Sequence, residues 1–193
     1  MKKSFQTLPC GYTEICQIDL QKNKKLSLFV NGVAFLIAAL MFVIMQCFVP
    51  ISTMFSLEDG FLPYILRFAA LLVFSVLYII LHELTHGVAM KLCGTKKVKY
   101  GFTGIYAFAG STDYYAKKPY IFIALAPIVL FLVIFAILQA LVPTEWIWII
   151  YLLQITNCSG AAGDLYVTFK FFSLPSDILV KDHGTSMTVY KKE

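Results

Sequence analysis

The sequence predicts an all-α polytopic membrane protein with four transmembrane helices and a short β-hairpin-like loop on the cytoplasmic side. Three observations predict this class. The 193-residue chain is 59% hydrophobic and 14% charged, whereas globular domains carry about 25% charged residues. Apolar stretches long enough to cross a bilayer recur along the chain. Its lysines gather beside these stretches, where interfacial loops and termini are expected.

The first two segments predict a basic arm followed by a membrane span. Residues 1–25 are polar and basic, and we expect a short cytoplasmic arm on the membrane surface. Residues 26–49 form an unbroken apolar stretch that is long enough to span a bilayer. It is too long for the apolar region of a cleaved signal peptide. We therefore interpret it as a retained first transmembrane helix.

Residues 62–93 predict a second and longer transmembrane helix. Gly94 directly follows it and is a natural helix stop. Arg67, in the first turns of this helix, is a charged residue within an apolar segment. We expect this side chain to reach the interface or to pair with Glu58 or Asp59.

Residues 94–118 differ in character, because glycines punctuate a run of aromatic and β-branched residues. The alternation of Val98, Tyr100 and Phe102 predicts short strands in a membrane-associated loop. Two interpretations stay open. The segment is either an interfacial loop with aromatic anchors, or an edge strand that holds an extended peptide by strand addition.

The second half of the chain predicts two more spans and a tail. Residues 119–142 form the third apolar helix, which Pro127 is expected to kink. Residues 145–172 form the fourth, and residues 173–193 are a polar cytoplasmic tail.

Lysine placement predicts the topology. The arm, the 94–118 loop and the tail are lysine-rich, whereas the 50–61 loop and the 143–145 turn have none. We therefore expect an integral protein of the cytoplasmic membrane with both termini in the cytoplasm. The formal charge of +5 follows from this topology, and no nucleic-acid partner is expected.

The strongest chemical signal is His82-Glu83-Leu84-Thr85-His86, set inside the second apolar segment. Histidines four residues apart lie on one helical face and can bind one metal ion. Glu83 lies about a third of a turn away, where it can act as a general base without binding the metal. The alternative is that the two histidines only pack at a helix end, although such groups are costly at membrane depth.

Asp164 is the expected third ligand, because a hydrolytic zinc site needs three protein ligands and an open position. His86 precedes Lys91 by five residues, and Asp164 precedes Lys170 by six. At about 1.5 Å per residue, both groups lie at a similar depth. The alternative is that Asp164 caps a helix or pairs with Lys170.

Asn157 lies seven residues before Asp164 and so on nearly the same helical face. Its amide could stabilise a substrate carbonyl or the developing oxyanion, or form an interhelical hydrogen bond. Two side chains are weaker metal-site candidates: Cys93 could approach the metal, and His183 lies in the polar tail. Five cysteines without a C-x-x-C pair indicate no disulfide framework.

These residues carry a family resemblance. A helix with His82-Glu83-x-x-His86, a basic glycine-rich loop, a proline-kinked helix and Asn157-x-x-Gly160-x-x-Gly163-Asp164 resemble the site-2 protease class of intramembrane metalloproteases. The chain is more closely similar to the small bacterial putative zincin peptidase family, a domain of unknown function. The resemblance covers about residues 60–172.

The resemblance implies a zinc-dependent intramembrane endopeptidase acting on membrane-embedded or membrane-proximal substrates, with one zinc ion per chain. Its metal ligands would be His82, His86 and Asp164, and its catalytic residues Glu83 and Asn157. The expected partners are a membrane protein or peptide substrate and the lipid bilayer. The alternative is a non-proteolytic membrane metal-binding protein, such as a sensor, a transporter part or a degenerate enzyme.

Overall fold

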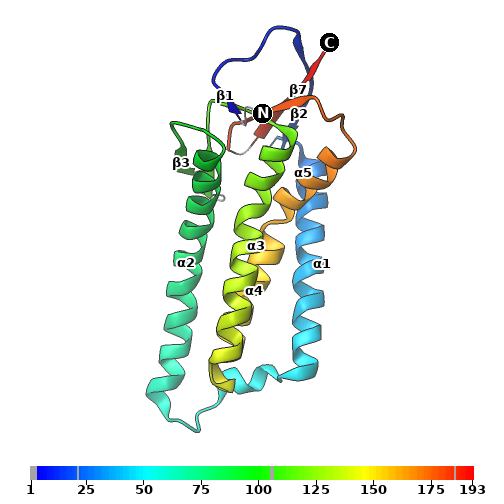
Figure 1. The fold of residues 1–193 in the computed structure, drawn as a ribbon. Helices are drawn as coiled ribbons and strands as arrows, with labels where there is room; N and C mark the ends of the chain where they lie inside the picture. Colours follow the sequence, from blue (N-terminus) through cyan, green and yellow to red (C-terminus); the bar gives the residue numbers. More distant parts are fainter. Residues whose placement is uncertain (1–3, 21, 105–106, 185) are drawn as a thin grey trace. The chain divides into compact units, whose positions relative to one another are not determined.

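The computed structural model describes residues 4–20, 22–104, 107–184 and 186–193, and Figure 1 traces the chain through them. Most of these residues are helical. In chain order the elements are β1 (Ser4–Phe5), β2 (Tyr12–Asp19), α1 (Lys24–Phe48), the 3₁₀-helix η1 (Ile51–Phe55), α2 (Phe61–Leu92), β3 (Lys99–Phe102), β4 (Ala107–Gly110), β5 (Tyr114–Ala116), α3 (Lys117–Leu141), α4 (Thr144–Gly160), α5 (Ala162–Phe172), β6 (Ile178–Asp182) and β7 (Ser186–Lys192).

Three helices of the described chain, α1, α2 and α3, are long and apolar enough to cross a membrane. They expose large aliphatic side chains, for example Leu36, Leu72 and Val129, which a bilayer would cover. The expectation of four spans is therefore supported for three helices.

The fourth expected span, residues 145–172, is divided into α4 and α5. The break falls at Ala161, between Gly160 and Gly163. Glycine loses more conformational freedom in a helix than other residues do, so this small-residue stretch is a weak point for helical continuity. The break places Asp164 in the first turn of α5, where the free N–H groups of a helix favour a carboxylate.

The expectation of an all-α fold is wrong, because the arm and the tail form a sheet. Its five strands are antiparallel and run in the order β1-β5-β6-β7-β2. Tyr12 in the arm pairs with Lys192 in the tail. Such pairing joins opposite ends of the chain, so no local sequence pattern reports it. The backbone N–H and C=O groups of the arm and the tail, which were expected to face water, form hydrogen bonds between strands instead.

The hairpin expected within residues 94–118 is present as β3 and β4, which pair antiparallel from Lys99↔Gly110 to Phe102↔Ala107. Residues 105–106 of this loop lie outside the described residues.

The chain divides into two compact units. The first comprises residues 1–30, 80–127 and 163–193, and its core joins the inner face of the five-stranded sheet to the ends of α2, α3 and α5. The second comprises residues 31–79 and 128–162, and two aromatic-rich clusters form its core.

Specific contacts fix both ends of α2. At its start, the buried Arg67 guanidinium lies 3.7 Å from the Asp59 carboxylate and donates to the Ser56 carbonyl, which confirms the expected pairing. At its end, Gly94 has φ +103. The Thr95 N–H donates to the Met90 carbonyl at 3.1 Å, which completes a helix-ending motif that favours glycine.

Candidate metal centre

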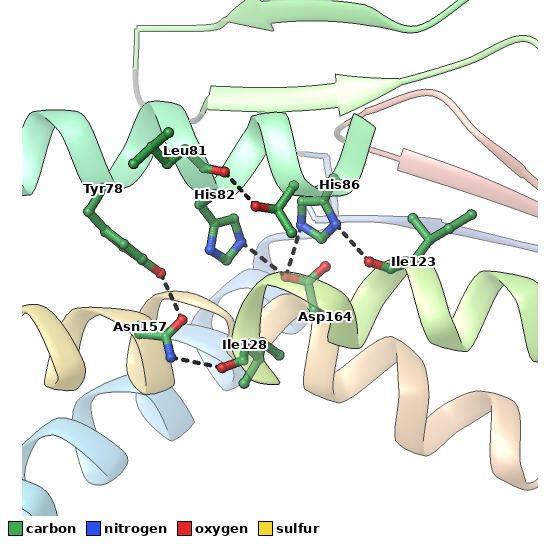
Figure 2. A network of polar contacts seen from close by, with 9 residues as sticks. Tyr78, Leu81, His82, His86, Ile123, Ile128, Asn157 and Asp164 are labelled. Atoms are coloured by element: carbon green, nitrogen blue, oxygen red, sulfur yellow. Dashed lines mark hydrogen bonds and ion pairs between the residues drawn. The ribbon is translucent and has the colours of Figure 1, made fainter. Parts of the chain in front are cut away.

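The two motif histidines lie on successive turns of α2. Because four residues make slightly more than one helical turn, the rings of His82 and His86 face the same side, with centroids 5.0 Å apart. Figure 2 shows both rings directed toward Asp164. Their side chains are 12% and 11% exposed, so little water competes for their ring nitrogens.

Asp164 reaches both rings from the first turn of α5. Its Oδ2 atom lies 3.9 Å from His82 Nε2 and 3.7 Å from His86 Nε2. One ligand atom from each of the three residues lies within 4.8 Å of the others, and this is the group of metal-ligating side chains found in the described residues. The sequence-predicted ligands are therefore brought together by two segments far apart in the chain.

The other ring nitrogen of His86 has its own partner. His86 Nδ1 lies 2.9 Å from the backbone carbonyl oxygen of Ile123 in α3. A carbonyl can only accept, so Nδ1 carries the proton and donates. In the neutral ring Nε2 then carries the free lone pair, and it is the nitrogen that faces Asp164. A backbone carbonyl on the distal nitrogen is the usual way in which a metal-binding imidazole is oriented.

The donor set fits a zinc ion. Two neutral imidazole nitrogens and a carboxylate are typical of catalytic zinc sites with one open position. Zinc–ligand distances of about 2.0–2.1 Å in a tetrahedral arrangement place two donors about 3.3 Å apart. The observed separations of 3.7 and 3.9 Å exceed this by a few tenths of an ångström. Such a difference is within the reach of side-chain rotation.

Glu83 belongs to the same turn but lies outside the donor group. It is partly buried, and the backbone N–H of Ala109 in β4 approaches its carboxylate. This contact joins the motif to the hairpin. In an antiparallel ladder, an N–H that reaches another element points away from the paired strand. The Ala109 N–H therefore points to the edge of β4 that is not paired with β3.

Asn157 lies in the second compact unit and is fully buried. Its Nδ2 donates to the Ile128 carbonyl at 3.1 Å, and its Oδ1 accepts from the Tyr78 hydroxyl at 3.1 Å. Figure 2 shows these bonds. They join α2, α3 and α4 within that unit, which is the interhelical alternative raised by the sequence. A role for Asn157 at an oxyanion stays a prediction.

The weaker candidates have other surroundings. Cys93 is buried in the core of the first unit, where its thiol lies 4.0 Å from the Pro119 carbonyl oxygen. His183 Nε2 lies 3.4 Å from the Thr188 hydroxyl. Partial burial, and then the nearby Lys181, lower the pKa of His183.

Two buried polar residues in the strands of the five-stranded sheet, Asp182 and Tyr115, have no signal in the sequence. Burial raises the pKa of Asp182 in β6 to about 6, although hydrogen bonds from the Tyr120 hydroxyl and the Gly184 N–H, both 2.7 Å long, act in the opposite direction. Burial also raises the pKa of Tyr115 in β5 to about 12. Both side chains lie close to the start of α3, where strands of the sheet meet this helix. No local sequence motif predicts such a meeting point.

Sequence comparisons bear on this geometry. Residues 75–179, just over half of the chain, match the profile of a family described as "Putative zincin peptidase". The chain is also 32% identical over 117 residues to a Pyrococcus woesei protein described as "Uncharacterized 24.7 kDa protein in gap 5'region". That match covers 58% of this chain and 50% of the relative. No solved structure matches significantly.

Proposed function

Because the chain belongs to the family described as "Putative zincin peptidase", we propose that it is a zinc-dependent endopeptidase that hydrolyses peptide bonds of membrane-embedded or membrane-proximal substrates. The family description indicates a metallopeptidase. The membrane setting, the substrate class and the residue roles are our proposal.

One observation carries the proposal. The Nε2 atoms of His82 and His86 and the Oδ2 atom of Asp164 converge, while Glu83 lies one residue from the first ligand and outside the donor group. A site built only to hold a metal does not need that carboxylate. A hydrolase does, because it must move a proton from water to the leaving group.

The residues would divide the reaction as follows. His82, His86 and Asp164 would hold the zinc ion, which when bound would supply Lewis-acid polarisation of a carbonyl and a lowered pKa for water. Glu83 removes a proton from the attacking water and returns it to the leaving amine nitrogen. The Ala109 N–H beside Glu83 orients the carboxylate for both transfers.

The substrate would bind in extended form along the free edge of β4. The Ala109 carbonyl points to the same edge as its N–H, so it can accept a hydrogen bond from a substrate N–H. Strand addition of this kind holds a peptide through its backbone and is tolerant of sequence. A transmembrane substrate would first have to unwind, because a helix uses its carbonyls in its own hydrogen bonds.

The membrane setting rests on composition and charge. The helices α1, α2 and α3 are long and apolar enough to cross a bilayer, and the lysine-rich arm, loop and tail favour cytoplasmic termini in an integral membrane protein. The motif near the lysine-bearing end of α2 would then act close to the cytoplasmic surface.

The decisive experiment compares the wild type with Glu83→Gln in detergent micelles or liposomes. We expect the wild type to cleave a quenched fluorescent peptide, and Glu83→Gln to lose at least about a hundredfold in kcat, since general acid–base catalysis contributes about 10²–10⁴-fold. Both proteins should hold about one zinc ion per chain.

Two outcomes would separate the rivals. Zinc bound by both proteins with no cleavage by the wild type would favour a non-proteolytic metal-binding protein. A membrane-tethered copy of the peptide tests the substrate class, because equal cleavage of the free and tethered forms would contradict a membrane-restricted substrate.

A further inference from the structure

Pro127 interrupts the hydrogen bonding of α3 at one defined carbonyl. It is the eleventh residue of this helix, Lys117–Leu141, and proline has no backbone N–H. The carbonyl four residues earlier therefore has no intrahelical donor. That carbonyl belongs to Ile123, whose side chain is 2% exposed. A buried carbonyl without a hydrogen-bond partner destabilises the folded protein.

The missing donor is replaced by a metal-site histidine. His86 Nδ1 lies 2.9 Å from the Ile123 carbonyl oxygen, and Figure 2 shows this bond on the side of the ring opposite Asp164. The carbonyl that Pro127 releases is thus the one that binds His86. Because a proline also bends its helix away from the released carbonyl, the oxygen is tilted outward, toward a donor on another element.

We propose that Pro127 is a positioning residue for the metal centre. It keeps the Ile123 carbonyl available, so that His86 holds its proton on Nδ1 and presents the Nε2 lone pair toward Asp164 and His82. This inference rests on the proposed zinc site for its consequence, but the link from Pro127 to the His86 tautomer does not require a metal.

The substitution that tests the link is Pro127→Ala in the full-length protein. Alanine restores an N–H that competes for the Ile123 carbonyl within its own helix. The helix itself should form at least as well, since alanine is the strongest helix former. Loss of the variant through misfolding is therefore not expected, and thermal unfolding in detergent checks this.

Pro119→Ala is the matched control. Pro119 lies in the first turn of the same helix, where an N–H has no intrahelical acceptor. The same chemical change there should leave the metal centre unaltered.

Two measurements decide the inference. Chelator competition should show zinc affinity reduced about 10- to 100-fold in Pro127→Ala, the range for loss of a group that orients a ligand, with no change in Pro119→Ala. Nitrogen-15 NMR of the three histidines in metal-free protein, at a pH at which their rings are neutral, should show His86 protonated at Nδ1 in the wild type and in Pro119→Ala, and a mixture of tautomers in Pro127→Ala.

Failure of this inference can be distinguished from failure of the proposed function. If Pro127→Ala keeps both the wild-type zinc affinity and the wild-type His86 tautomer, the positioning role is overturned. If the wild type binds no zinc, the proposed function fails, and the tautomer comparison alone decides the role of Pro127. An unchanged tautomer would then overturn it.

Discussion

Two polar clusters lie in apolar helices of this chain, one in each compact unit, and they differ in how their polar atoms meet. In the second unit, the Asn157 amide makes direct hydrogen bonds of 3.1 Å to Tyr78 and Ile128. In the first unit, the Asp164 carboxylate stops 3.7 and 3.9 Å from two imidazole nitrogens, which is longer than a hydrogen bond. The direct hydrogen bonds of Asn157 link three helices, so this cluster has a structural role. The gap in the Asp164 cluster leaves room for an ion among its donors.

The largest expected effect comes from changing the cluster of His82, His86 and Asp164 in the first unit. Asp164→Asn keeps the side-chain shape but removes the charge and the stronger ligand. We expect zinc affinity to fall by more than about a hundredfold, beyond the range seen when a ligand's supporting group is lost. Chelator competition on purified protein measures this. Asp177→Asn, an exposed aspartate outside the donor group, is the control and should bind like the wild type.

A change in the Asn157 cluster of the second unit should lower the stability of the protein rather than its metal binding. Asn157→Leu would leave the Tyr78 hydroxyl and the Ile128 carbonyl without this partner, so we expect a loss of about 1–3 kcal/mol in unfolding free energy. Zinc content should be unchanged. Tyr78→Phe removes one of the two bonds and should cost less. Denaturant unfolding in detergent, with metal analysis, gives both quantities.

The opposite result would assign Asn157 a chemical role. A large fall in kcat with wild-type stability and zinc content would favour the oxyanion interaction that the sequence raised, and would contradict the purely structural interpretation.

The buried Asp182 is a carboxylate of the first unit that lies outside the donor group. Burial raises its pKa from 3.8 to about 6 in the folded protein, so the folded state binds more protons between these values. Stability should therefore fall as the pH rises from about 4 to about 6, by at most about 3 kcal/mol. The Tyr120 hydroxyl and the Gly184 N–H donate to Asp182, and the charges of His86 and Asp164 also act on its carboxylate.

Asp182→Asn should flatten this part of the stability profile, measured with chelator present so that zinc does not contribute. If the variant retained the wild-type slope between pH 4 and pH 6, another group would have to be its source.

The smallest effect is expected at Gly87, next to His86. A Cβ added there would clash with the Tyr100 hydroxyl of β3. Tyr100 is 48% exposed, so its ring can swing away at little cost. We expect Gly87→Ala to keep its zinc and to change stability by less than about 1 kcal/mol. Because the hairpin would lose a contact with α2, we expect a modest rise in KM for a peptide, measured by steady-state kinetics.

A KM for Gly87→Ala equal to that of the wild type would argue against substrate binding beside this hairpin, while leaving the metal centre untouched.

The donor cluster could be anticipated from the sequence because its information is local. Spacing alone puts His82 and His86 on one helical face, and the lysine positions predict similar depths for His86 and Asp164. The pairing of Arg67 with Asp59 follows from the cost of a lone buried charge.

The remainder depends on contacts between distant segments. Nothing near Tyr12 indicates that it pairs with Lys192, so the sheet was missed. The backbone groups of Ile123 and Ala109 that touch His86 and Glu83 leave no residue-type signature. Pro127 was the available signal for the first of them, because a proline within a helix always releases a carbonyl four residues earlier.

Zinc K-edge X-ray absorption spectroscopy of the purified, detergent-solubilised wild type tests the central claim most directly. The account predicts about one zinc per chain, with a first shell of nitrogen and oxygen at about 2.0–2.1 Å that includes two imidazoles. Absence of stoichiometric zinc would contradict it. So would a sulfur ligand at about 2.3 Å, which would point to a cysteine such as Cys93 instead of the Asp164 carboxylate.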